Sequence, residues 1–366
     1  MILKKHKYLR HLIVLIILAS CSSTSKNIQF NSIEYEERDS KDYQEIFDYQ
    51  SFSLNDLKTI QRIIENDDLN QQQLRDAKLL KKNFQKILSK KKFSLELNPG
   101  QQYSKEVIRL IYQFNLPIKV LWDKTEKNPL PENLLMKKIN GFCSSVYEDA
   151  IASINEVIKQ TNDSILIIYS KNYESFMKNL KSNNSNFMTE QYDASDFQAF
   201  AAEILGINFS NNRFKKISSL SPSQKLNYIP QPRSDLSKII LLLGSQEYKS
   251  MLPALRYHGG NSYEYINFIS SMEEITNPLQ LLDYEDSWTP ISKYLATKIQ
   301  KDELVSIEKF LELGALHEWL LVQILNQAEV ESAKINGVNG SIIFKSNSCS
   351  KRIIPLKKIS TNLFST

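Results

Sequence analysis

The stretch of residues 232–260 constrains the fold of this chain more than any other part of its sequence. Residues 239–243 are five consecutive apolar residues, a run too short to cross a membrane but suited to a strand buried on both faces. Gly244 and Ser245 interrupt the run, and an amphipathic helix is expected to follow them. Because a strand that leads into a helix through a short turn is half of a β-α-β crossover, the sequence predicts a parallel sheet.

The first 20 residues have the layout of a secretory signal peptide, with a basic start, an apolar run at 12–19 and small residues before a cysteine. The sequence Leu18-Ala19-Ser20-Cys21 resembles a bacterial lipobox, which predicts cleavage before Cys21 and acylation of that residue. The alternative is an ordinary signal peptide or an uncleaved anchor. Because Ser22 follows in place of an aspartate, the expected destination is the outer membrane, with the protein facing the periplasm.

The net charge of +5 depends on the signal peptide, which carries four basic residues and no acid. The remaining chain holds 42 basic and 41 acidic residues, so it lacks the basic surface that nucleic-acid binding requires. Residues 21–52 are polar and are expected to form a lipidated tether. Residues 53–92 show two helical patterns and are expected to form a short helical segment.

Residues 93–366 alternate between strand-like runs and helical patterns, which predicts an α/β domain of two lobes. We place the C-terminal lobe mainly in 140–260 plus 330–356. Strands are expected at 93–97, 118–122, 165–169, 239–243 and 265–269, and a terminal hairpin at 341–344 and 352–356.

Motifs for catalysis, metals and cofactors are absent from the sequence. It contains no HExxH, no Walker loop, no GxGxxG and no GxSxG. Only His258 and His317 remain after signal cleavage, and the loop acids Asp283, Glu285 and Asp286 are expected to be solvated. We therefore predict a protein that is not an enzyme and has neither a metal site nor a cofactor.

Cys143 and Cys349 are the two cysteines that remain beside the lipidated one. Export to an oxidising compartment allows a disulfide between them, and two isolated thiols are the alternative.

Several segments resemble the penicillin-binding protein activator lipoproteins (LpoA type), in the order in which that family has them. The matches cover about 93–356: 116–121 resembles the family's "LPVPVLAL", 141–150 its "FGLSPEDEA" segment, 164–169 "ALVLAP", 192–207 "YDP…DFS…LLGI", 233–243 "RRQDIDAIFLVA", 252–257 "L.PQLRFH", 313–314 "ALGYDAYRL", and 337–341 "GLTGTL".

The resemblance implies a type I periplasmic-binding-protein-like fold with parallel sheets. It also implies that the N-terminal lobe is reduced, because the family's long helical domain and first β-α-β unit have no counterpart here. By resemblance, the protein would regulate peptidoglycan synthesis by binding and activating a class A penicillin-binding protein.

Two other hypotheses stay open from the sequence. A lipid-anchored receptor for a small polar ligand would bind it between the lobes, with Ser245 and Gln246 as vestigial ligand contacts at the end of the strand at 239–243. The alternative role of these two residues is the start of a helix. A scaffold that has lost its partner is the remaining hypothesis.

Overall fold

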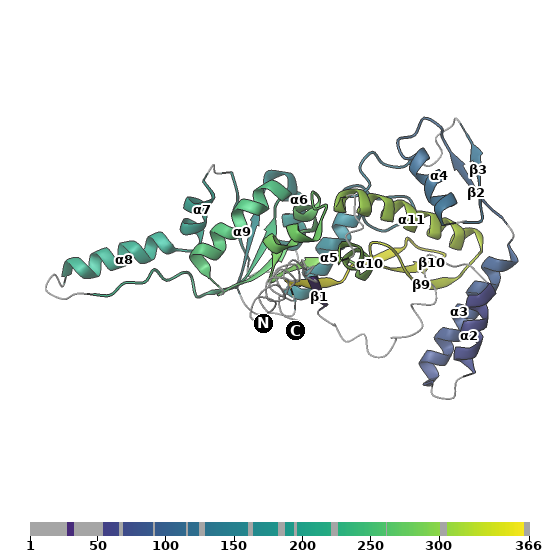
Figure 1. Cartoon of the computed structure of the whole chain (residues 1–366), viewed down its shortest axis with the longest axis horizontal. Helices are drawn as coiled ribbons and strands as arrows, with labels where there is room; N and C mark the ends of the chain where they lie inside the picture. The colour runs from purple at the N-terminus through teal and green to yellow at the C-terminus, as the bar shows by residue number, and fades with distance from the viewer. Residues whose placement is uncertain are drawn as a thin grey trace, which may run out of the picture.

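Figure 1 shows a computed structural model of the chain. It describes residues 28–32, 54–65, 69–90, 92–114, 116–123, 129–159, 164–181, 187–193, 196–220, 226–260, 262–300 and 306–361. The expected signal peptide and Cys21 lie outside these residues.

The larger lobe is built on a seven-stranded sheet, here called the main sheet, with the order β1-β12-β8-β7-β6-β4-β5. Strands β4 to β8 run parallel, and β12 and β1 extend the sheet beyond β8 in antiparallel pairings. The strands are β4 (Ser164–Tyr169), β5 (Phe187–Gln191), β6 (Leu236–Leu242), β7 (Glu264–Asn267), β8 (Ser287–Pro290), β12 (Leu356–Thr361) and β1 (Ile28–Ser32). This parallel core confirms the predicted α/β class.

Helices cover both faces of the main sheet. Helix α5 (Val146–Ile158) packs against α6 (Glu174–Lys181), and α7 (Phe197–Ile204) packs against α9 (Ser245–Gly259). The connection from β4 to β5 and the connection from β6 to β7 run in opposite directions across the sheet. Because such crossovers are right-handed, their helices lie on opposite faces, so the pair α5 and α6 covers one face and the pair α7 and α9 the other. Strand β6 therefore lies between two helical layers, and Ile239 to Leu243 have no exposed surface.

The second lobe is small. It contains the predicted β-α-β unit, in which β2 (Phe93–Leu97) pairs in parallel with β3 (Ile118–Trp122) across α4 (Ser104–Gln113). The long helix α11 (Ile307–Gln327) packs against α4 and β2. Its last residue, Gln327, holds the outer edge of β2, since its side-chain amide both donates to and accepts from the Ser94 backbone. The expected reduction of the N-terminal lobe is thus visible as a sheet of two strands.

A three-stranded antiparallel sheet, here called the small sheet, joins β9 (Ser332–Asn336), β10 (Ser341–Lys345) and β11 (Lys351–Ile353). The preceding helices, α2 (Leu54–Ile64) and α3 (Gln71–Ser89), pack against each other as the expected helical segment. Asn83 of α3 donates its side-chain amide to the Ser332 carbonyl at 2.7 Å, which attaches this helical pair to the small sheet.

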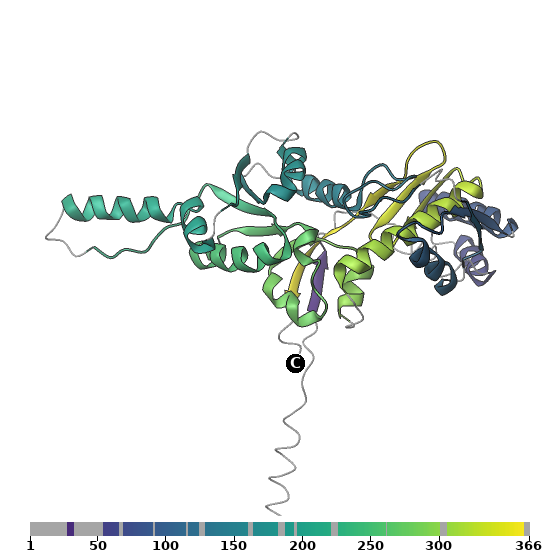
Figure 2. The same ribbon diagram turned by 90° about the horizontal axis from the view of Figure 1, so that it is seen from above.

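Helix α8 (Ile207–Leu220) extends away from the main sheet in both views (Figures 1 and 2), whereas α10 (Lys293–Gln300) lies near the middle of the molecule. No helix in the described ranges is long and apolar enough to cross a membrane.

Three expectations about the organisation of the chain need correction. The expected tether at 21–52 contains a strand, because β1 pairs with β12 over its whole length. The expected hairpin strand at 352–356 is divided: β11 ends at Ile353 in the small sheet, and β12 begins at Leu356 in the main sheet. Pro355 lies between them and lacks the N–H that a continuous ladder would need.

The expected limits of the C-terminal lobe also differ from the structure. Strands β7 and β8, at 264–290, belong to the main sheet although they fall outside the predicted 140–260. Residues 332–353 form the small sheet instead of joining the main one. The chain therefore crosses between the lobes more often than the two predicted ranges imply.

Candidate functional site

The first candidate site is at the carboxyl ends of β4 and β6. These neighbouring strands mark the point where the strand order reverses, which is where open α/β sheets bind ligands. The Ser170 N–H donates to the Leu242 carbonyl at 3.1 Å, so the two strand ends are joined just beyond the ladder. The Ser170 side chain is buried, and its Oγ has no hydrogen-bond partner among the described residues.

The predicted ligand contacts Ser245 and Gln246 form the first turn of α9. Gly244 is the N-cap, and its N–H donates to the Glu247 carboxylate at 3.0 Å. Ser245 is buried beside the phenol of Tyr284, whereas Gln246 is exposed and donates to Glu274 Oε2 at 2.6 Å. The structure thus directs the two side chains to different surroundings, and they do not form a joint ligand contact.

An aromatic cluster fills the space beside these strand ends. It consists of Tyr147 of α5, Tyr173 just after β4, Phe176 of α6 and Phe268 just after β7. The ring centre of Phe268 lies 4.9 Å from that of Tyr147 and 5.5 Å from that of Tyr173. Burial raises the pKa of Tyr173 above its usual value. Sequence reasoning missed the cluster because its members come from three separate segments of the chain. The protein's own rings therefore pack against one another beside the point where the strand order reverses.

The loop acids Asp283, Glu285 and Asp286 do not converge on one point. Asp283 and Asp286 are exposed, and Asp286 pairs with Lys358 at 3.0 Å. The described residues contain no group of three or more histidine, cysteine, aspartate or glutamate side chains that could hold a metal ion.

The histidines lie apart from these strand ends. His317 is in the middle of α11 and packs edge-on against Phe114, with ring centres 4.5 Å apart. Burial lowers the pKa of His317 to about 3, so its imidazole stays neutral near pH 7. His258 lies in the last turn of α9, beside the ring of Tyr257.

An acidic group lies where α11 begins, and sequence reasoning did not single it out. Burial, together with the nearby charge of Glu308 and then those of Glu274 and Glu312, raises the pKa of Glu273 to about 8. The Tyr103 hydroxyl donates to Glu312 Oε1 at 3.1 Å and so connects α11 to the loop before α4. Glu273 therefore holds a proton near neutral pH and loses it at alkaline pH.

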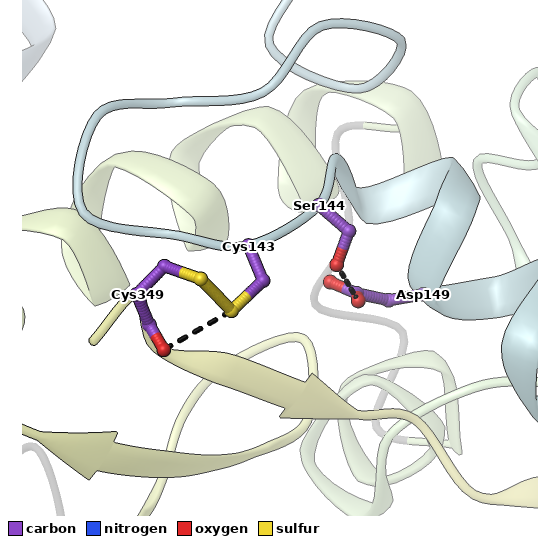
Figure 3. The surroundings of a disulfide bond; sticks show 4 residues. All are labelled: Cys143, Ser144, Asp149 and Cys349. Carbon is purple, nitrogen blue, oxygen red and sulfur yellow. Dashed lines mark hydrogen bonds between the residues drawn. A yellow bond between two sulfur atoms is a disulfide. The ribbon is translucent and has the colours of Figure 1, made fainter.

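The junction between the lobes holds the two cysteines. Figure 3 shows Cys143 and Cys349 joined in a disulfide, with Cα atoms 4.9 Å apart. The two segments beside the disulfide form an isolated parallel β-bridge between Phe142 and Ser350. Of the two alternatives that the sequence left open, the structure has the disulfide, and it attaches the start of α5 to the small sheet.

A buried ionic triad lies next to this disulfide. Arg352 donates to Asp149 at 2.7 Å and to Glu318 at 2.6 Å, and all three side chains are almost completely buried. The Glu318 carboxylate also accepts from the Asn339 N–H at 2.6 Å, and Ser144 donates its hydroxyl to Asp149 (Figure 3). Both carboxylates already have a cation and hydrogen-bond donors, so the triad is a structural junction between the lobes.

Comparison with solved structures finds distant structural similarity. No protein-family model matches the chain, and no curated protein matches it. The solved structure of an ABC transporter substrate-binding protein from Desulfitobacterium hafniense, in complex with Leu, aligns with a TM-score of 0.37 and 7% sequence identity. The alignment covers 74% of this chain and 98% of that one.

Proposed function

We propose that the chain is an outer-membrane lipoprotein that binds a class A penicillin-binding protein and activates its transpeptidase. In this proposal the protein performs no chemistry of its own and acts through a protein interface. Activation is then a coupling free energy between the interface and the partner's active site.

The observation that carries the proposal is the ordered series of segments that resemble the activator lipoproteins. Four of these segments overlap regular elements in chain order: 116–121 overlaps β3, 164–169 is β4, 233–243 contains β6 and 252–257 lies in α9. The lipobox at 18–21 adds an anchor that such a regulator requires.

The aromatic packing at the strand ends supports a regulator over a receptor. Tyr147, Tyr173, Phe176 and Phe268 occupy the region where this class of sheet binds small molecules. A ligand at this place would have to displace these rings. Exposing their apolar surface, which is now packed, would cost free energy. Ser245, one of the two expected contacts, is already packed beside Tyr284.

The test is a transpeptidase assay with the purified lipidated chain and the class A penicillin-binding protein of the same cell. We expect the chain to bind this enzyme and to raise the rate of peptide cross-linking. The matched control is bovine serum albumin in the same detergent. No binding, or binding without a change in the rate, would contradict the proposal.

The anchor is tested separately with Cys21→Ala. If Cys21 carries the lipid, this variant leaves the outer-membrane fraction. The same change at Ser22 leaves the protein in that fraction. Retention of the Cys21→Ala variant would exclude Cys21 as the anchor.

One observation favours the alternative function, a lipid-anchored receptor for a small polar ligand. The buried Ser170 Oγ has no hydrogen-bond partner among the described residues and lies at the point where the strand order reverses. A thermal-shift screen of amino acids and muropeptides tests it. A true ligand at 100 times its Kd would add about 2.7 kcal/mol to the free energy of unfolding. Ser170→Ala should abolish the effect of that ligand.

A further inference from the structure

A projection from the larger lobe is here called the arm. It consists of α8 and the returning segment 226–233, and it extends beyond the main sheet in both views (Figures 1 and 2). Its base lies at the amino ends of β6 and β7, since Arg233 precedes β6 and contacts Tyr263, which precedes β7.

The arm is held in a fixed conformation by contacts between its two halves. The rings of Phe214 and Tyr228 stack with their centres 4.3 Å apart. The Tyr228 hydroxyl also lies 3.1 Å from the Ser210 hydroxyl and donates to Asn211 Oδ1 at 2.6 Å. These contacts use one face of α8 and leave the opposite face to the solvent.

The base of the arm is part of the folded lobe. The Arg233 N–H donates to the Leu205 carbonyl at 2.9 Å, and the Tyr263 hydroxyl donates to the Arg233 carbonyl at 2.6 Å. Gly206 adopts a φ of +74°, which lets the chain turn sharply between α7 and α8. The arm therefore leaves the lobe at a defined angle.

The outward face of α8 is apolar and basic. Phe209 is 76% exposed and Leu220 is 83% exposed, and Arg213 and Lys216 lie between them and are exposed as well. The spacings of four, seven and eleven residues from Phe209 place these side chains on one stripe of the helix. Aromatic side chains and arginine are enriched among the residues that dominate protein interfaces, and the stripe offers both in Phe209 and Arg213.

The charge of the arm has a single sign. The sequence contains no aspartate or glutamate between Glu203 and Asp235. Arg213, Lys215 and Lys216 form no ion pair with any described residue. A partner that buries this stripe must therefore offer acidic side chains around an apolar groove, because unpaired buried charge is costly.

The position of the arm distinguishes a protein partner from the membrane that would hold the anchor. The N-terminal segment that would carry the anchor joins the main sheet at the edge strand β1. The arm instead starts beside β6 and β7, which lie four and three places from β1 in the strand order. The base of the arm is thus separated from the anchored edge by the intervening strands, which favours a protein partner over that lipid surface.

We propose that the outward stripe of α8 docks as a helix into an apolar groove with an acidic rim on the class A penicillin-binding protein. This inference rests on the proposed function and assigns its interface. It uses the helix-in-groove mode, in which apolar residues on one helix face enter pockets and charged residues select the partner.

The experiment measures the Kd between the purified lipidated full chain and the class A penicillin-binding protein. The test variants are Phe209→Ser with Leu220→Ser, and Arg213→Glu with Lys216→Glu. All four side chains are exposed, so the variants should keep the melting temperature of the wild type. The matched controls are Leu279→Ser, which is 64% exposed, and Lys78→Glu on α3.

Each arm variant is expected to weaken binding at least tenfold, and the controls should bind like the wild type. The affinity should fall with added salt for the wild type and depend less on salt for Arg213→Glu with Lys216→Glu. A photo-crosslinker at Ile217 should join the chain to the penicillin-binding protein, and one at Leu279 should not.

The outcomes separate the two proposals. If the wild type binds and the arm variants bind equally well, the arm is not the interface and the proposed function stands. If the wild type does not bind, the proposed function itself fails. Crosslinks from Ile217 to a second copy of the chain, or arm-dependent binding to anionic phosphatidylglycerol vesicles alone, would overturn the protein-groove assignment.

Discussion

The guanidinium of Arg352 donates from Nε to the Glu318 carboxylate at 2.6 Å, and both side chains are almost completely shielded from water. The same guanidinium reaches Asp149, so one cation joins β11, α11 and α5. These elements belong to both lobes. Buried ion pairs are satisfied only in one arrangement, which makes the triad a determinant of how the lobes meet.

Arg352→Met should destabilise the protein by about 3–5 kcal/mol at pH 7, because it leaves Glu318 and Asp149 buried without a cation. Urea unfolding monitored by circular dichroism measures the change. Burial raises the pKa of both carboxyls, so the variant should recover part of its stability at acidic pH as they take up protons.

Lys178→Met is the matched control for this prediction, since it breaks the exposed pair with Glu174. It should leave the unfolding midpoint unchanged. Equal effects of the two substitutions would show that the buried triad has no special part in stability.

Reduction of the Cys143–Cys349 disulfide should destabilise the fold by about 2–4 kcal/mol, because the bond closes a loop over a sequence separation of 206. Cys143→Ser with Cys349→Ser should show the same loss without reductant. The wild type should move faster on a non-reducing gel than on a reducing one. Two reactive thiols in the unfolded, unreduced protein would contradict the pairing.

Glu273→Gln should stabilise the protein at alkaline pH. An unfolded glutamate ionises near 4.5, whereas the pKa of Glu273 in the fold is raised to about 8 by burial and then by neighbouring acids. The proton therefore favours the folded state, and stability falls as pH rises from about 4.5 to about 8. Melting temperatures at pH 5 and pH 9 should differ less for the variant.

Exposed Glu203→Gln serves as the comparison, and its melting temperatures should follow those of the wild type at both pH values. If Glu273→Gln also follows the wild type, Glu273 is ionised in the folded protein.

His317→Leu should reduce the loss of unfolding free energy that the wild type shows as pH falls below about 6.5. The pKa of His317 is lowered to about 3 in the fold, so stability is present above the unfolded value near 6.5 and is lost as pH falls below it. At pH 5 the loss from this group is about 2 kcal/mol. Urea unfolding at pH 7 and pH 5 measures the difference.

A substitution that only removes packing, Val322→Ala, is the control for His317. Val322 is fully buried, so its truncation should lower stability by the same amount at both pH values. An unchanged acid slope in His317→Leu would assign that slope to other groups.

The elements that could be predicted are those whose signal is local. The apolar run at 239–243 needs no neighbour to be recognised as a buried strand, and it forms β6. The spacing of Ser145 and Glu148 predicts a helix start, and the structure has the reciprocal capping box there. Both signals lie within a few residues of sequence.

The strands that were missed depend on neighbours. Strand β8 has only four residues and follows an acidic loop, and its place in the main sheet comes from pairing with β7 and β12. Strand β5 pairs on one side only and is partly exposed. Short strands of this kind lack a periodic pattern, so the sequence alone does not distinguish them from loops.

The site was less predictable than the fold for the same reason. Asp149, Glu318 and Arg352 each resemble a solvated surface charge in the sequence, and only the packing of three distant segments shows that they share one buried point. The aromatic cluster around Phe268 is likewise assembled from segments that the sequence does not connect.

If Cys21 carries the lipid, the position of strand β1 limits how far the main sheet can lie from the membrane. Only six residues separate Cys21 from Ile28, where the backbone joins the main sheet. A fully extended chain rises by about 3.5 Å per residue, so the β1 edge stays within about 25 Å of the membrane surface. With that anchor the β1 edge would stay close to the bilayer, and the proposed partner would have to reach the protein there.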